Sequence, residues 1–202
     1  MTQVLEVHDL VKRFSGRTVV DHVCFEVSEG QIVGLLGRNG AGKTTSFRAT
    51  IGMITPEEGQ IIFNGQDVTR LAMYERAQRG MGYLSQEPSI FQRLTVEQHL
   101  LAILETRPLP RGQRYDRVTE LVSQFGLQHN RNQQARTLSG GERRKLEIAR
   151  ALITEPSLVL LDEPFSGVDP VAVEELQREI RRLRDEHPVS YTHLTLPTSD
   201  LV

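Results

Sequence analysis

The sequence predicts an α/β fold with a helical insert, and three observations predict it. A short apolar run at residues 32–36 is followed by a glycine-rich loop and then by a proline-free segment long enough for a helix. A second apolar run at residues 158–161 ends in two carboxylates, at the strand edge where open α/β sheets bind ligands. Between the two runs, residues 94–125 have a helical pattern that breaks around Pro108 and Pro110.

Short strands and turns surround the glycine-rich loop. Residues 4–36 are strand-rich, with a turn near Ser15-Gly16, which predicts an antiparallel β region at the N-terminus. Further along the chain we expect a strand at 59–63 followed by a turn at Asn64-Gly65, a helix at 71–79 and a strand at 81–85.

Composition bounds the class of protein. The chain has 202 residues, 38% of them hydrophobic, and a net charge of −2. This balance argues against a dedicated nucleic-acid binder, and the basic run at residues 143–145 is expected to form a solvated helix face. The single cysteine, Cys24, excludes an intrachain disulfide and is expected to be a buried strand residue in a reducing compartment. The N-terminus lacks a signal-peptide pattern and no apolar stretch approaches about 20 residues, which predicts a cytoplasmic protein.

Residues 37–44, GRNGAGKT, match the phosphate-binding pattern G-x-x-x-x-G-K-[ST] at every fixed position. Glycines let backbone N–H groups turn toward phosphate oxygens, and the start of the following helix adds partial positive charge. In this pattern Lys43 reaches the β- and γ-phosphates, and the Thr44 hydroxyl binds Mg²⁺. The residues expected to bind nucleotide are Gly37, Arg38, Asn39, Gly40, Ala41, Gly42, Lys43, Thr44 and Thr45.

Asp162 and Glu163 follow the second apolar strand directly. Two carboxylates at a strand end are by themselves more often solvated acids than catalytic groups. Together with the phosphate-binding loop, however, they favour a nucleotide-hydrolysing site. Asp162 is then expected to hold Mg²⁺, directly or through water, and Glu163 to polarise the attacking water as general base.

The sequence favours adenine as the base. A guanine-reading element of the form N/T-K-x-D is absent from the sequence. Phe14 lies in a polar stretch before the phosphate-binding loop, where an aromatic ring is either a loosely held core residue or a stacking platform for a base. We interpret Phe14 as the platform.

Residues 138–142, LSGGE, form a second segment suited to phosphate. Ser139 and Glu142 match the capping box S-x-x-E, which predicts that a helix begins here. Apolar residues continue at helical spacing through position 153, and Pro156 follows. Capping does not require glycine at positions 140 and 141. A phosphate that approaches the backbone closely does require residues without side chains there, which Gly140 and Gly141 provide. Two phosphate-binding helix N-termini in one chain indicate that two chains share two nucleotides.

These segments occur in the order found in ATP-binding-cassette (ABC) ATPases, which residues 1–187 resemble. The resemblance implies a P-loop ATPase core that carries a helical subdomain at about residues 87–155. It also implies a head-to-tail homodimer, in which each ATP lies between the phosphate-binding loop of one chain and Ser139, Gly140, Gly141 and Glu142 of the other.

The resemblance also implies a role for Gln86 and a partner in the membrane. In this family the corresponding glutamine contacts Mg²⁺ or the attacking water, which implies catalytic and metal-binding roles for Gln86. Integral-membrane permease subunits dock on the segment that corresponds to residues 86–104. The implied location is therefore the cytoplasmic side of the inner membrane, with attachment through the permease.

Within the family, residues 82–96, 140–150 and 162–170 resemble the ATPases of bacterial lipopolysaccharide export. The resemblance implies that ATP hydrolysis powers extraction of lipopolysaccharide from the inner membrane. Three alternatives stay open: an ATPase of branched-chain amino-acid import, a soluble ABC protein acting on ribosomes, and a binding-only relative without hydrolysis.

The last part of the sequence departs from the family pattern. Residues 171–187 are expected to form a helix, after which the family has a strand and a loop with a catalytic histidine. Thr192-His193 superficially imitates that histidine loop, but the strand before it is too short and too polar, and Pro197 blocks a following helix. Residues 188–202 resemble sequencing-adaptor read-through, so we expect a non-native tail. A chain without the histidine is then expected to hydrolyse ATP weakly.

Overall fold

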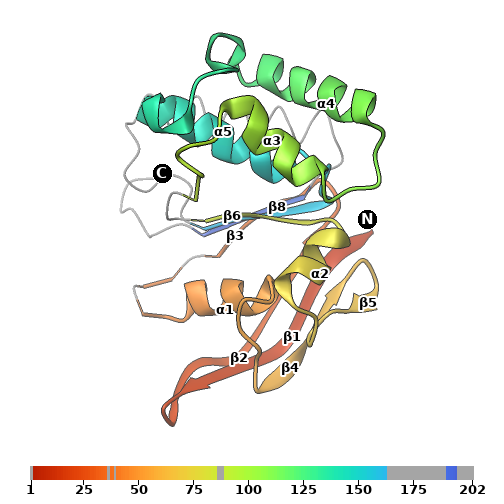
Figure 1. The fold of residues 1–202 in the computed structure, drawn as a ribbon. Coiled ribbons are helices and arrows are strands. Elements are labelled where there is room, and N and C mark those ends of the chain that lie inside the picture. The colour runs from red at the N-terminus through yellow and green to blue at the C-terminus, as the bar shows by residue number, and fades with distance from the viewer. Residues whose placement is uncertain (1, 36, 39, 86–88, 163–189, 195–202) are drawn as a thin grey trace. The chain divides into compact units, whose positions relative to one another are not determined.

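The computed structural model describes residues 2–35, 37–38, 40–85, 89–162 and 190–194 (Figure 1). The helix expected at residues 171–187 lies outside these ranges. The chain divides into two compact units, one formed by residues 1–86 and 157–202 and the other by residues 87–156.

The first unit contains an antiparallel sheet of order β2-β1-β4-β5. Its strands are β1 (Gln3–Phe14), β2 (Arg17–Ser28), β4 (Glu58–Phe63) and β5 (Gln66–Asp67). The strands β1 and β2 form a hairpin whose turn is Ser15-Gly16, and both turn residues have positive φ angles. The predicted antiparallel region and its turn are therefore confirmed.

The same unit contains a parallel sheet of order β3-β8-β7-β6. Its strands are β3 (Ile32–Leu35), β8 (Ser190–Leu194), β7 (Leu158–Leu161) and β6 (Met81–Leu84). We expected the segment before Thr192-His193 to be too short and too polar for a strand, and β8 contradicts this: the strand forms and includes Thr192 and His193 themselves. Tyr191 and Thr192 have high β propensity, and the backbone groups of β3 and β7 pair with β8 whatever side chains it carries.

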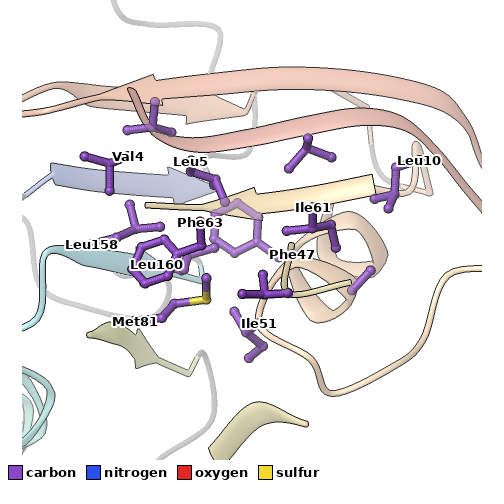
Figure 2. Close-up of a cluster of buried hydrophobic side chains, with 14 of the residues drawn as sticks. Val4, Leu5, Leu10, Phe47, Ile51, Ile61, Phe63, Met81, Leu158 and Leu160 are labelled. Atoms are coloured by element: carbon purple, nitrogen blue, oxygen red, sulfur yellow. The ribbon is translucent and has the colours of Figure 1, made fainter. Parts of the chain in front are cut away.

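The core of the first unit is a cluster of buried apolar side chains that joins both sheets to α1 (Lys43–Thr50) (Figure 2). Phe47 from α1 is fully buried, as are Leu5 and Ile61 from the antiparallel sheet and Leu158 and Leu160 from β7. Burying a large apolar side chain contributes about 1.5–3 kcal/mol, so this cluster fixes α1 firmly.

Cys24 is exposed, and the prediction of a buried cysteine is wrong. Side chains alternate between the two faces of β2. Val27 is fully buried and Val23 and Phe25 pack against the core cluster, so Cys24 and Glu26 lie on the opposite face. The alternation was visible in the sequence, but the face that meets the core was not.

A buried arginine holds the C-terminal end of α1. Arg76, from α2 (Met73–Gln78), donates to the carbonyl oxygens of Ala49 and Thr50 over 2.8 and 2.5 Å. It also donates to the carbonyls of Leu71 and Thr69. Burial lowers the pKa of Arg76 to about 10, so the side chain remains charged at neutral pH. The last carbonyls of α1, which a helix cannot satisfy itself, are thus bound by a cation.

The second unit is helical. It contains α3 (Val96–Leu104), α4 (Arg111–Gln124) and α5 (Gly140–Leu152), with short 3₁₀ turns η1 (Gln128–Asn130) and η2 (Ala135–Thr137) before α5. α3 packs against both α4 and α5. The predicted helical pattern and its break are confirmed, since residues 105–110 separate α3 from α4. The predicted apolar stripe of α5 is buried, including Leu146, Ala149 and the C-cap Ile153.

Candidate nucleotide-binding site

The phosphate-binding loop connects the end of β3 to the start of α1. α1 has Gly42 as its N-cap, with a φ of 84°, and no side chain caps this helix end. A Cβ atom at Gly42 would lie 2.3 Å from the carbonyl oxygen of Val19. Glycine is therefore required at position 42 for two reasons: the backbone is left-handed, and β2 leaves no room for a side chain.

Lys43 is the first residue of α1 and reaches back over the loop. Its Nζ donates to the carbonyl oxygens of Gly37 at 2.5 Å and Arg38 at 3.0 Å. The ammonium group thus lies against the backbone of the loop, while Lys43 itself is the first residue of α1. This combination of a cation and a helix N-terminus is suited to a group with several negative oxygens.

Asp162 follows β7 and is 2% exposed. Its Oδ2 accepts a hydrogen bond from the Tyr83 hydroxyl at 3.3 Å, and its backbone N–H donates to the carbonyl of Leu84. β3 and β7 are parallel members of one sheet, so their carboxyl ends meet at the same sheet edge. The structure therefore brings Asp162 and the phosphate-binding loop to one edge, as predicted. Three predicted site residues, Asn39, Gln86 and Glu163, lie outside the described residues.

The second phosphate-suited segment lies in the helical unit, at the start of α5. Ser139 is the N-cap, and its Oγ accepts from the backbone N–H of Glu142 at 3.3 Å. The Glu142 carboxylate accepts from the backbone N–H of Ser139 at 2.8 Å, so the predicted capping box is confirmed. Within the described residues, a Cβ atom at Gly140 or Gly141 would meet no atom within 4 Å. Close packing in this part of the chain therefore does not require either glycine.

Glu142 is held in its charged form. Hydrogen bonds from Ser139 lower the pKa of its carboxyl group, and the Asn130 amide donates to its other oxygen at 3.0 Å. Sequence reasoning missed the contact from Asn130, which precedes Glu142 by twelve residues and belongs to η1.

Phe14 is 47% exposed at the end of β1. The Nζ of Lys12 lies 5.3 Å from the centre of its ring. Exposure on this scale is unusual for a core phenylalanine and leaves ring surface for a ligand to contact. Lys12 was not among the predicted site residues, although its position two residues before Phe14 places both side chains on one face of the strand.

The chain belongs to the ATP-binding proteins of the ABC transporter family, because the family model described as "ABC transporter" matches residues 20–166. Members of this family bind ATP and hydrolyse it to drive transport.

The relatives of the chain within this family include proteins named lipopolysaccharide export system ATP-binding protein LptB. The LptB of Escherichia coli K12 is 49% identical over 182 residues, which are 90% of this chain and 76% of that protein. The LptB of Acidithiobacillus ferridurans is 47% identical over 184 residues, 91% of this chain and 76% of that protein.

Solved structures agree with the family and the fold. An ATP-binding cassette of an ABC transporter in its ADP conformation has a TM-score of 0.86 at 25% identity, with 98% of this chain and 83% of that chain covered. The structure of cbiO1 from Clostridium perfringens, part of an ABC transporter complex, has a TM-score of 0.88 at 25% identity and covers 97% and 79% of the two chains. The predicted fold class is confirmed.

Among the helices of the described residues, none is long and apolar enough to cross a membrane. Within the same residues, no three His, Cys, Asp or Glu side chains gather in a way that could hold a metal ion.

Proposed function

We propose that this chain is the ATP-hydrolysing subunit of a lipopolysaccharide exporter and works as a head-to-tail dimer. The observation that carries the proposal is the identity of 47–49% with proteins named LptB over about nine-tenths of the chain. The phosphate-binding loop and the start of α5 supply the chemistry that such a subunit needs.

ATP binding begins at the loop between β3 and α1. Phosphate oxygens replace the two carbonyls that Lys43 now contacts, and the first N–H groups of α1 donate to the same phosphates. Adenine stacks on the exposed ring of Phe14, a contact worth about 1–3 kcal/mol by analogy with base stacking elsewhere. The two ends of the nucleotide are thus bound by residues of one unit.

Hydrolysis requires a metal site and a base. The Thr44 hydroxyl, Gln86 and Asp162 carry the oxygen donors that Mg²⁺ prefers and would hold the ion, which neutralises phosphate charge when bound. Tyr83 keeps the Asp162 carboxylate oriented through its hydroxyl. Glu163, the next residue, takes the proton of the attacking water.

The second half of each ATP site comes from a second copy of the chain. Ser139, Gly140 and Gly141 present a helix N-terminus without a side chain at the two glycine positions. A γ-phosphate can approach this backbone closely. The Ser139 hydroxyl then exchanges its long bond to the N–H of Glu142 for a phosphate oxygen.

The dimer is tested by substitution of the general base. In Glu163→Gln the carboxylate can no longer accept the proton of water, so ATP remains bound and the dimer accumulates. Size-exclusion chromatography with light scattering, in ATP and Mg²⁺, should show the mass of two chains for this variant and of one chain for Glu163→Gln combined with Lys43→Ala. A single-chain mass for Glu163→Gln in saturating ATP would rule out the shared site.

The transported substrate is tested through the partner. The tagged chain should co-purify from detergent-solubilised inner membranes with the permease subunits of lipopolysaccharide export. In the purified complex, lipopolysaccharide should stimulate ATP hydrolysis, and Lys43→Ala should abolish it. Recovery with a solute-importer permease in place of the export permeases would contradict the assignment.

A further inference from the structure

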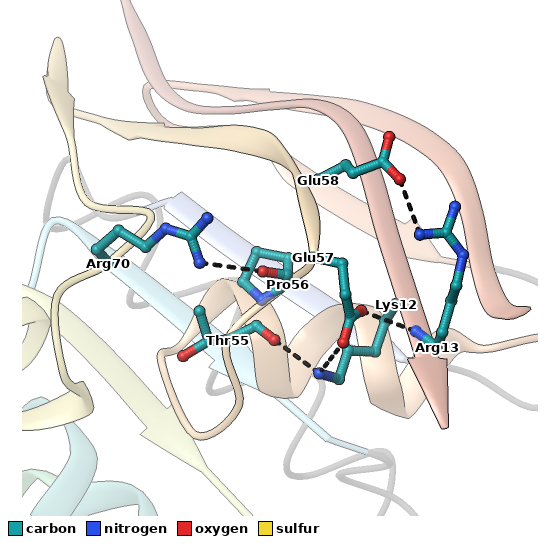
Figure 3. Close-up of polar contacts among 7 residues, drawn as sticks. All are labelled: Lys12, Arg13, Thr55, Pro56, Glu57, Glu58 and Arg70. Carbon is teal, nitrogen blue, oxygen red and sulfur yellow. Dashed lines mark hydrogen bonds and ion pairs between the residues drawn. The ribbon is translucent and has the colours of Figure 1, made fainter. Parts of the chain in front are cut away.

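A polar network joins the last part of β1, which ends at Phe14, to the segment that leads into β4 (Figure 3). The ammonium group of Lys12 donates to the carbonyl oxygen of Thr55 and to Oε1 of Glu57, both at 2.8 Å. The same ammonium lies 5.3 Å from the centre of the Phe14 ring. The Lys12 ammonium group therefore contacts a carbonyl oxygen, a carboxylate and the face of an aromatic ring.

Glu57 is itself held in place. Its Oε2 accepts from the backbone N–H of Arg13 at 2.8 Å, and its own N–H donates to the carbonyl of Val11. The hydrogen bond from Lys12 is the largest of the effects that keep the pKa of Glu57 below its ordinary value, so the carboxylate stays charged. On the other side of the same loop, Arg70 donates to the carbonyl of Pro56 at 3.2 Å.

The position of Lys12 determines what the ring can do. Lys12 is largely buried, with 13% of its side chain exposed, whereas Phe14 is 47% exposed. A lysine side chain has four rotatable bonds and normally moves freely, but this one is tied at its end. A cation fixed over one ring face attracts that face and limits rotation of the ring, which leaves its exposed surface in one orientation.

We propose that Lys12 and Glu57 are positioning residues that orient the Phe14 ring for stacking on the adenine of ATP. This inference rests on the proposed ATP-binding function. Neither residue touches the nucleotide in this arrangement: Glu57 acts on Lys12, and Lys12 acts on the ring. The pair therefore affects recognition of the base and leaves recognition of the phosphates unchanged.

The experiment compares two probes, ATP and inorganic triphosphate, by isothermal titration calorimetry in Mg²⁺. Lys12→Met keeps most of the side-chain length without the charge, and Glu57→Gln keeps the shape of the anchor. Each should weaken ATP binding roughly two- to fivefold, the scale of an exposed cation–ring contact, and leave triphosphate binding unchanged. Phe14→Ala should weaken ATP binding roughly tenfold, again with unchanged triphosphate binding.

Two controls separate the network from its surroundings. Glu58→Gln removes the neighbouring ion pair with Arg13, which touches neither Lys12 nor the ring, and should leave both affinities unchanged. Lys12→Met added to Phe14→Ala should cause no further loss of ATP affinity, because no ring remains to be oriented.

The outcomes are distinct. An effect of Phe14→Ala without any effect of Lys12→Met or Glu57→Gln would overturn the inference and leave the adenine platform standing. Equal losses for ATP and triphosphate would show a general effect on folding and also overturn it. Unchanged ATP affinity in Phe14→Ala would remove the platform and the inference together. Whichever of these results is found, loss of both ATP and triphosphate binding in Lys43→Ala would still support ATP binding at the phosphate-binding loop.

Discussion

The two helix N-termini suited to phosphate, those of α1 and α5, are built in opposite ways. α1 starts at Gly42, has no side-chain cap and depends on other elements at both ends, with β2 close to Gly42 and Arg76 on its last carbonyls. α5 caps itself through Ser139 and Glu142. The difference teaches that α1 is shaped by the fold of its own unit, whereas the described part of the fold leaves the space at Gly140 and Gly141 open, as the proposed approach of a phosphate from a second copy requires.

The largest effect is expected from Gly42→Ala. The new Cβ atom collides with the carbonyl of Val19 and the backbone stays at a positive φ, so stability should fall by about 3 kcal/mol or more. ATP binding should be lost along with the loop geometry. Urea unfolding and nucleotide titration measure the two effects, and a stable variant with normal ATP affinity would contradict the described loop.

Gly141→Ala is the matched substitution at α5. Its Cβ atom meets open space and its φ is not positive, so stability should stay within about 0.5 kcal/mol of the unsubstituted chain. ATP should still bind to the monomer, but the ATP-dependent dimer of the Glu163→Gln background should not form. A dimer mass measured by light scattering for this variant in ATP would contradict the role of Gly141 in the shared site.

Arg76→Met tests the other end of α1. Methionine fills a similar volume but leaves the carbonyls of Ala49, Thr50, Leu71 and Thr69 without their buried donor. We expect a loss of about 2–4 kcal/mol in unfolding free energy. Arg79→Met, at the exposed C-cap of the same helix, is the control and should change stability little.

Ser139→Ala should have a smaller effect on stability, about 1 kcal/mol, the usual cost of removing an N-cap side chain. The helical unit should unfold at lower urea, with no change in the affinity of a monomer for ATP. If Ser139→Ala lowered the unfolding free energy more than Arg76→Met does, the conclusion that α1 depends on other elements more than α5 does would be wrong.

The smallest expected effect is on the stability of the chain at acidic pH. The pKa of Glu142 is lowered in the folded chain, so its contribution to stability is full above the ordinary value of 4.5 and disappears as the pH falls through the lower, folded value. α1 has no acidic residue in its first turn. Between about pH 6 and pH 3, Glu142→Gln should therefore lose less stability than the unsubstituted chain, as measured by urea unfolding. Parallel losses in the two proteins would refute the role of this carboxylate.

Sequence reasoning succeeded where a local pattern is enough. The phosphate-binding loop and the capping box are contiguous, and each residue type has a direct backbone function, so Gly42, Ser139 and Glu142 were assigned from spacing alone. The apolar stripe of α5 was also predictable because helical periodicity is local.

Contacts between distant segments were not predictable. Glu57 meets Lys12 across 45 positions, and Arg76 reaches Ala49 across 27, so neither contact leaves a local pattern. Cys24 was misplaced because alternation indicates two faces of a strand without saying which one is covered. The strand β8 was rejected on side-chain polarity, although its pairing with β3 and β7 is a matter of backbone groups.

The position of β8 has a consequence for synthesis of the protein on the ribosome. Among the described strands, β8 comes last in sequence and lies between β3 and β7, so these two cannot be joined until residues 190–194 have emerged. β1, β2 and β4 need no later segment to pair with one another. The antiparallel sheet can therefore assemble early during translation, whereas the parallel sheet keeps a gap, and an aggregation-prone strand edge, until residues 190–194 have left the ribosome.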